Sequence, residues 1–116
     1  MNTAIVLAGG SGKRMNSDIP KQYLMLAGKP VIYYSLKAFQ DNSHIDNIIL
    51  VTAEEYIDYA KENILDKTLS KVSMVVQGGM ERYDSVYKGL QCIKEPGYVF
   101  IHCLLYTSDA ADDLIG

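Results

Sequence analysis

The 116-residue sequence contains no tryptophan, three prolines and only two cysteines. Cys92 and Cys103 fit neither a disulfide framework nor a C-x-x-C metal site, so a reducing compartment is the simpler interpretation. An excess of positive charge is also missing, because the formal net charge is -3. Nucleic acids and anionic membranes attract positively charged protein surfaces, and the composition therefore argues against both as partners.

Long hydrophobic runs are absent as well. No apolar segment approaches the roughly 20 residues that a membrane-spanning helix needs, and no basic stretch followed by a long apolar one opens the sequence. We therefore expect a cytoplasmic protein. The sequence is 48% hydrophobic and 22% charged, which is ordinary for one globular domain that can bury a core.

Short apolar runs alternate with helix-like patterns along the chain. The first run, residues 4–7, is continuous, which is typical of a parallel strand buried on both faces. Strands are also predicted at residues 47–51, 72–76 and 98–101, and helices at 31–40, from 52 onward and around 86–93. This alternation predicts an α/β fold, a Rossmann-like parallel sheet with helices on both faces and ligands at the carboxyl ends of the strands.

Each predicted helix has one apolar face. In the first helix, Ile32, Leu36 and Phe39 share a face, and Pro30 suits the first turn. The second helix is expected to begin with a capping box, because a threonine and a glutamate stand three residues apart at Thr52 and Glu55. The apolar positions of the second and third helices are Ala53, Ile57, Ala60 and Ile64, and Val86, Leu90 and Ile93.

A glycine-rich segment with three cations follows the first strand. The glycines among residues 9–12 let the main chain curl so that successive N–H groups point inward and bind an anion. Lys13, Arg14 and Lys21 add positive charge where a triphosphate would lie. A dinucleotide fingerprint would need glycine at Met15, and a P-loop would need glycine at Leu7 and Ser or Thr at Arg14, so the segment is neither. A tight turn with solvated side chains is the alternative, but a turn requires fewer glycines and cations.

Three segments carry a resemblance to a known family. LAGGSGKRM at residues 7–15 and PKQYL at 20–24 resemble the signature of sugar-phosphate nucleotidyltransferases. GGMERYDSV at 78–86 is similar to a segment of the 2-C-methyl-D-erythritol 4-phosphate cytidylyltransferase family that lines its cytosine pocket. The resemblance runs from residue 4 to residue 102. It implies transfer of a cytidylyl group from CTP to this polyol phosphate, with release of pyrophosphate.

The resemblance also implies residue roles. Arg14 and Lys21 would be catalytic, because they correspond to the pair that holds the triphosphate and stabilises the transition state. The positions implied to bind substrate are Ala8, Gly9, Gly10, Gly12, Gly79, Met80 and Ser85, to which the charge pattern adds Lys13. The resemblance further implies a magnesium ion held by aspartates, and a homodimer.

The sequence departs from the family after His102. There the family continues with an Asp-x-Ala-Arg-Pro segment whose aspartate binds magnesium, whereas this chain has Cys103 followed by LLYTSDAADD. That string resembles a translated sequencing-adapter read-through. We therefore expect residues 1–102 to be the N-terminal part of a nucleotidyltransferase domain and 103–116 to be a non-native tail. The aspartate ligands and the dimerisation arm would then be missing, and the chain as written is expected to be inactive.

Other functions remain open on the sequence. A ribitol 5-phosphate cytidylyltransferase would share the glycine loop and Pro-Lys-Gln, although ERYDSVYKGL favours the methylerythritol phosphate enzymes. A protein that binds a nucleotide without turning it over is an alternative from a different functional class.

The remaining histidines and tyrosines are not expected to be functional. His44 and His102 lack metal-ligand spacing, and the tyrosines at 33, 34, 56 and 59 are expected to serve packing.

Overall fold

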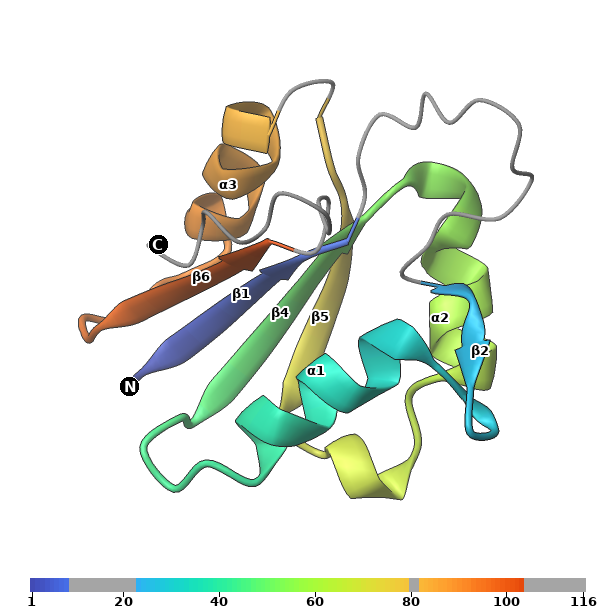
Figure 1. Cartoon of the computed structure of the whole chain (residues 1–116). Helices are drawn as coiled ribbons and strands as arrows, with labels where there is room; N and C mark the ends of the chain where they lie inside the picture. The colour runs from blue at the N-terminus through green and yellow to red at the C-terminus, as the bar shows by residue number, and fades with distance from the viewer. Residues whose placement is uncertain (9–22, 80–81, 104–116) are drawn as a thin grey trace, which may run out of the picture.

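The computed structural model describes residues 1–8, 23–79 and 82–103, and its centre is a parallel sheet (Figure 1). Four strands lie in the order β5-β4-β1-β6, with every neighbouring pair parallel. Their bounds are β1 Thr3–Leu7, β4 Asn47–Thr52, β5 Val72–Gln77 and β6 Val99–Cys103. The chain steps from β1 to β4 to β5 in one direction and then returns to place β6 on the other side of β1. The strand order therefore reverses at β1, the kind of position at which α/β sheets bind ligands.

Strand β1 is buried along its whole length. It lies between β4 and β6, and its successive side chains point to opposite faces of the sheet. Ala4 and Val6 belong to the core cluster of one face, and Ile5 and Leu7 to that of the other. The continuous apolar run predicted a strand covered on both faces, and the structure confirms it.

Helices α1 (Val31–Gln40) and α2 (Ile57–Asn63) cover the first face, together with the short 3-10 helices η2 (Glu54–Tyr56) and η3 (Lys67–Leu69). Ile32 and Leu36 of α1 are fully buried, and Phe39 packs against the same cluster, as the helical spacing predicted. The hairpin strands β2 (Met25–Leu26) and β3 (Lys29–Pro30) precede α1. Pro30 ends β3 and occupies the N-cap position of α1 instead of its first turn.

Helix α3 (Arg82–Gln91) covers the second face (Figure 1). Val86 and Ile93 pack against the second core cluster, as predicted, although Ile93 lies beyond the end of the helix. The prediction for Leu90 is wrong, because its side chain is 41% exposed. Gly89 contacts the sheet in its place: a Cβ added there would lie 2.8 Å from Cγ2 of Ile5. A glycine lets the helix backbone approach the strand closely, and the helix then turns Leu90 outward.

The predicted capping box at Thr52 is also wrong. Thr52 is the last residue of β4, and its hydroxyl forms a hydrogen bond with the hydroxyl of Tyr23. The N-cap of η2 is Ala53, which makes no side-chain capping bond, and α2 begins only at Ile57. The side chain that the sequence pattern assigned to a helix start is held by a residue from another part of the chain.

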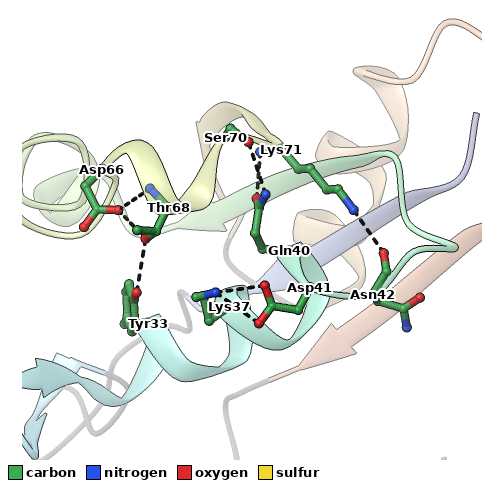
Figure 2. Close-up of polar contacts among 9 residues, drawn as sticks. All are labelled: Tyr33, Lys37, Gln40, Asp41, Asn42, Asp66, Thr68, Ser70 and Lys71. Carbon is green, nitrogen blue, oxygen red and sulfur yellow. Dashed lines mark hydrogen bonds and ion pairs between the residues drawn. The ribbon is translucent and has the colours of Figure 1, made fainter.

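Polar contacts join α1 to the segment that leads into β5 (Figure 2). The hydroxyl of Tyr33 shares a hydrogen bond of 3.1 Å with Oγ1 of Thr68. At the other end of α1, Gln40 Nε2 donates to Ser70 Oγ, and Gln40 Oε1 accepts the backbone N–H of Lys71. These bonds set the position of α1 along the sheet. Within the described ranges, no helix is long and apolar enough to cross a membrane.

Candidate functional site

The start of the predicted phosphate-binding loop lies at the carboxyl edge of the sheet. Ala8 follows β1, is fully buried, and donates its backbone N–H to the carbonyl of Val51 at 2.7 Å. The loop therefore leaves the sheet beside the end of β4. Its other predicted members lie outside the described residues, and their roles stay predictions; they are Gly9, Gly10, Gly12, Lys13, Arg14 and Lys21.

The second glycine loop lies at the same edge, between β5 and α3. The N–H of Gly78 donates to the carbonyl of Thr52 at 2.9 Å. The N–H of Gly79 donates to Oγ of Ser85 at 3.0 Å, and Ser85 itself is buried on α3. The structure thus brings together the predicted residues Gly79 and Ser85. Met80, predicted beside them, lies outside the described residues.

Both positions of this loop require glycine. A Cβ on Gly78 would lie 2.6 Å from Oγ of Ser85 and 3.2 Å from Cγ1 of Val51. A Cβ on Gly79 would collide with Cβ of Asp84. The loop therefore packs against α3 through bare backbone, which brings its main chain close to the helix.

A third contribution to this edge was missed from the sequence. Tyr23 is the first described residue after the glycine-rich segment, and it is only 3% exposed. Its hydroxyl lies 2.5 Å from Oγ1 of the buried Thr52. Its ring stacks on Tyr56 at 4.4 Å between centroids and meets the edge of Tyr59 at 5.6 Å. The expected packing role of Tyr56 and Tyr59 is thus observed. The signal for Tyr23 was its position directly after Pro-Lys-Gln, where a ligand loop must rejoin the fold.

Burial also shifts the pKa of two groups near this edge. Desolvation raises the pKa of Tyr23 to about 12, against a smaller opposing effect of the hydrogen bond with Thr52. The phenol therefore stays neutral at physiological pH and acts as a hydrogen-bonding group, not as a proton-transfer group. Burial lowers the pKa of His102, which lies beside Val6 and meets the ring of Phe39 edge-on at 5.7 Å. The neutral imidazole packs on α1.

The described ranges contain no group of three or more His, Cys, Asp or Glu side chains that could hold a metal ion. Cys103 ends β6, next to Leu7 of β1, and therefore lies at the carboxyl edge. A thiol is a poor ligand for magnesium, which prefers oxygen. The described residues do not fit a magnesium site.

Comparison with known proteins agrees with the sequence signature. The family model described as IspD, 2-C-methyl-D-erythritol 4-phosphate cytidylyltransferase, matches residues 2–114. A protein of that name from Lachnospira eligens is 64% identical over 102 residues, which cover 88% of this chain and 45% of the relative. The protein of the same name from Clostridium novyi is 51% identical over 102 residues, which cover 87% of this chain and 44% of the relative. The chain thus spans less than half the length of these curated relatives.

Solved structures give the same fold. The 4-diphosphocytidyl-2C-methyl-D-erythritol synthase of Anaerococcus prevotii superposes with a TM-score of 0.65 at 28% identity, covering 88% of this chain and 42% of that one. The IspD of Francisella tularensis superposes with a TM-score of 0.64 at 28% identity, covering 98% of this chain and 50% of that one. Sequence signature, sheet order and family match agree, and the chain belongs to the 2-C-methyl-D-erythritol 4-phosphate cytidylyltransferase family.

Proposed function

We propose that this chain supplies the nucleotide-binding part of an enzyme that transfers a cytidylyl group from CTP to 2-C-methyl-D-erythritol 4-phosphate. One observation carries the proposal beyond family membership. The start of the glycine loop at Ala8 and the second loop at Gly78 are bonded to consecutive residues, Val51 and Thr52, at the end of β4. The start of the loop expected to bind phosphates and the loop expected to bind a base therefore lie on either side of β4, at the carboxyl edge of the sheet.

The geometry of the second loop suits a small base. Because Ser85 Oγ accepts the N–H of Gly79, the hydroxyl keeps its own proton to donate to a base. The two glycines let the loop lie close to this hydroxyl, and α3 closes one side. We infer a preference for a pyrimidine, and for CTP over ATP or GTP.

The proposed reaction is an in-line displacement. A phosphate oxygen of the acceptor attacks the α-phosphorus of CTP, the bond from that phosphorus to the bridging oxygen breaks, and pyrophosphate leaves. Arg14 and Lys21 are proposed to stabilise the negative charge that develops on the phosphates. Positioning and electrostatics supply most of the catalysis in such transfers.

Several further assignments belong to the proposal because they concern the whole protein. They are a magnesium ion bound by aspartates that this chain does not supply, a homodimer, and a cytoplasmic location. The native part is proposed to end at about residue 102, with a non-native tail after it. No nucleic acid or membrane partner is proposed, in keeping with the net charge of -3.

The function is tested by pyrophosphate release from CTP and 2-C-methyl-D-erythritol 4-phosphate. Three proteins are compared: the chain as written, its Cys103→Asp variant, and a chimera joining residues 1–102 to the continuation of the Lachnospira eligens relative. We expect activity only in the chimera, because one carboxylate at position 103 does not restore the remaining groups that bind metal and acceptor. Ribitol 5-phosphate as acceptor and ATP and GTP as donors are the matched controls.

Three results of this assay would change the proposed assignment. Full activity of the chain as written would show that the native part does not end near residue 102. Equal turnover with a purine nucleotide would exclude a cytidylyltransferase but would still be consistent with another nucleotidyltransferase. A folded chimera without activity on either acceptor would contradict the proposed function.

A further inference from the structure

The segment that follows the glycine loop is attached to the rest of the fold at two points, one on the sheet and one on α1. Tyr23 is bonded through its hydroxyl to Oγ1 of Thr52, at 2.5 Å, and both residues are buried. One residue later, the carbonyl of Leu24 accepts the N–H of Val31 at the start of α1, at 2.9 Å. The second bond positions the hairpin and α1. Only the first reaches the carboxyl edge, where the site lies.

The bond to Thr52 pairs with the bond at the other end of the loop. Ala8 is bonded to Val51, and Tyr23 to Thr52, so both ends of the glycine-rich segment are held by consecutive residues of β4. Lys21 is two residues from Tyr23 in the sequence, a span of at most about 7 Å along an extended chain. The Tyr23 anchor therefore limits where Lys21 can lie.

Thr52 also contacts the second glycine loop. Its side chain bonds to Tyr23, while its carbonyl accepts the N–H of Gly78, whose neighbour Gly79 is bonded to Ser85. A continuous series of contacts thus links the end of the first loop to the second loop through one residue. We propose that Tyr23 and Thr52 form a positioning pair that fixes the first loop to β4 and aligns it with the Gly78–Gly79 loop. This inference rests on the function proposed above.

Packing alone does not account for the pair. The ring of Tyr23 is already held by its stacking on Tyr56 and its edge contact with Tyr59, so a phenylalanine would fill the same space. The hydroxyl groups add a directional contact between two fully enclosed side chains, which fixes the two segments relative to each other. Burial raises the pKa of Tyr23, so this contact persists throughout the physiological pH range.

The fold offers a matched control for the hydroxyl contact. Tyr33 and Thr68 form a second tyrosine–threonine hydrogen bond, at 3.1 Å, between α1 and η3 (Figure 2). The variants Tyr23→Phe and Tyr33→Phe each delete one phenol oxygen and one such bond. Thr52→Val removes the partner hydroxyl with little change of shape, and Thr52→Ser retains it. The four variants separate the positioning pair from a general effect of losing a tyrosine hydroxyl.

The first measurement uses the chain as written and does not depend on activity. Amide hydrogen exchange is followed at Gly78 and Gly79, with amides in the centre of β1 as a reference for global opening. Tyr23→Phe and Thr52→Val are expected to accelerate exchange at Gly78 by about fivefold or more, because Thr52 loses the contact that orients it. Tyr33→Phe and Thr52→Ser are expected to leave it within about twofold. Equal acceleration at β1 and Gly78, or an unprotected Gly78 in the unsubstituted chain, would overturn the proposal.

The second measurement uses the chimera. Tyr23→Phe and Thr52→Val are each expected to lower kcat about tenfold, with the KM for CTP changed less, because misplaced catalytic groups slow the chemical step. The double variant should lose no more than either single variant, since one contact is being removed. Unchanged kcat in both single variants, with a normal exchange pattern, would refute the pair. An inactive unsubstituted chimera would contradict the proposed function alone, because the exchange measurement still tests the pair.

Discussion

Backbone groups make most of the described contacts at the carboxyl edge. The N–H groups of Ala8, Gly78 and Gly79 are all bonded there, two of them to carbonyls of β4 and one to Ser85. Main-chain groups can hold a base or an oxygen in place, but they carry no net charge. The positive charge that a triphosphate needs must come from side chains, and the proposal assigns that role to Arg14 and Lys21.

Arg14→Ala and Lys21→Ala, each made in the chimera, should lower turnover by about 10² or more without changing the melting temperature. Each cation faces charge that grows in the transition state, so its loss weakens that state more than the ground state. Lys29→Ala is the control, because Lys29 pairs with Asp66 at 3.8 Å on the hairpin side of α1. Steady-state kinetics and thermal melts measure both effects. Near-normal turnover in either folded Arg14 or Lys21 variant would remove the assigned role.

The buried phenol of Tyr23 should make stability depend on pH in the alkaline range. Its pKa is raised from 10.0 to about 12, so the native state holds the proton more tightly than the unfolded chain does. The contribution is therefore fully present below pH 10 and is lost as pH rises toward 12. The size of the loss is roughly 2–3 kcal/mol.

This dependence is measured by urea denaturation of the unsubstituted chain and Tyr23→Phe between pH 8 and pH 11.5. The stability of the unsubstituted chain should fall relative to the variant above pH 10. Absorbance titration of the phenolate gives an independent value. A phenol in the unsubstituted chain that titrates near 10 and is missing from Tyr23→Phe would contradict the assigned burial.

Among the elements, α3 links the second core cluster to the site. Ser85 and Gly89 are four residues apart and therefore lie on the same side of the helix. Gly89 faces Ile5 of the central strand, while Ser85 accepts the N–H of Gly79. The close approach at Gly89 thus sets how near Ser85 lies to the second glycine loop.

Gly89→Ala should destabilise the protein, although alanine is the better helix former. An added methyl group would lie 2.8 Å from Cγ2 of the buried Ile5, and overpacking of this kind costs about 1–3 kcal/mol. The gain in helix propensity is only about 1 kcal/mol. We therefore expect a net loss of about 1 kcal/mol in urea denaturation, while Lys88→Ala at the exposed neighbouring position stays near zero. A more stable Gly89→Ala variant would show that α3 does not lie this close to β1.

At the scale of the whole molecule, the described sheet is covered unevenly. β1 and β4 are buried, whereas β6 forms an edge on which apolar side chains are open to solvent. Tyr98 is 75% exposed, and the three residues that follow it are 36%, 44% and 48% exposed. Because alternate residues point to opposite faces, both faces of the sheet are open at this edge.

This edge should make the chain as written self-associate. Exposed apolar strands at a sheet edge pair readily with other chains. Phe100→Lys and Ile101→Lys are each expected to shift the chain toward monomer in sedimentation velocity at tens of micromolar. Met74→Lys on β5, the opposite edge, serves as the control and should have a smaller effect. A monomeric unsubstituted chain, or an equal response to all three variants, would contradict association through β6.

Much of the fold could be predicted because its signals are local. The apolar run at 4–7, the helical spacing of Ile32 and Leu36, and the strands at 47–51 and 72–76 each depend on a few neighbouring residues. The structure confirms all of them, with boundaries shifted by one or two residues. The family resemblance was equally local, in three short segments, and the family match confirms it.

The sequence by itself thus determined the fold class and the family, and it located the second glycine loop at the end of β5. Only the tertiary structure decided which residues meet across the chain. Tyr23 and Thr52 are 29 positions apart, and their contact withdrew Thr52 from the predicted capping box. Likewise, Gly89 replaced Leu90 at the interface because the distance between α3 and β1 depends on the packing of both. Such contacts arise from the relative positions of whole elements, and periodicity within one element carries no information about them.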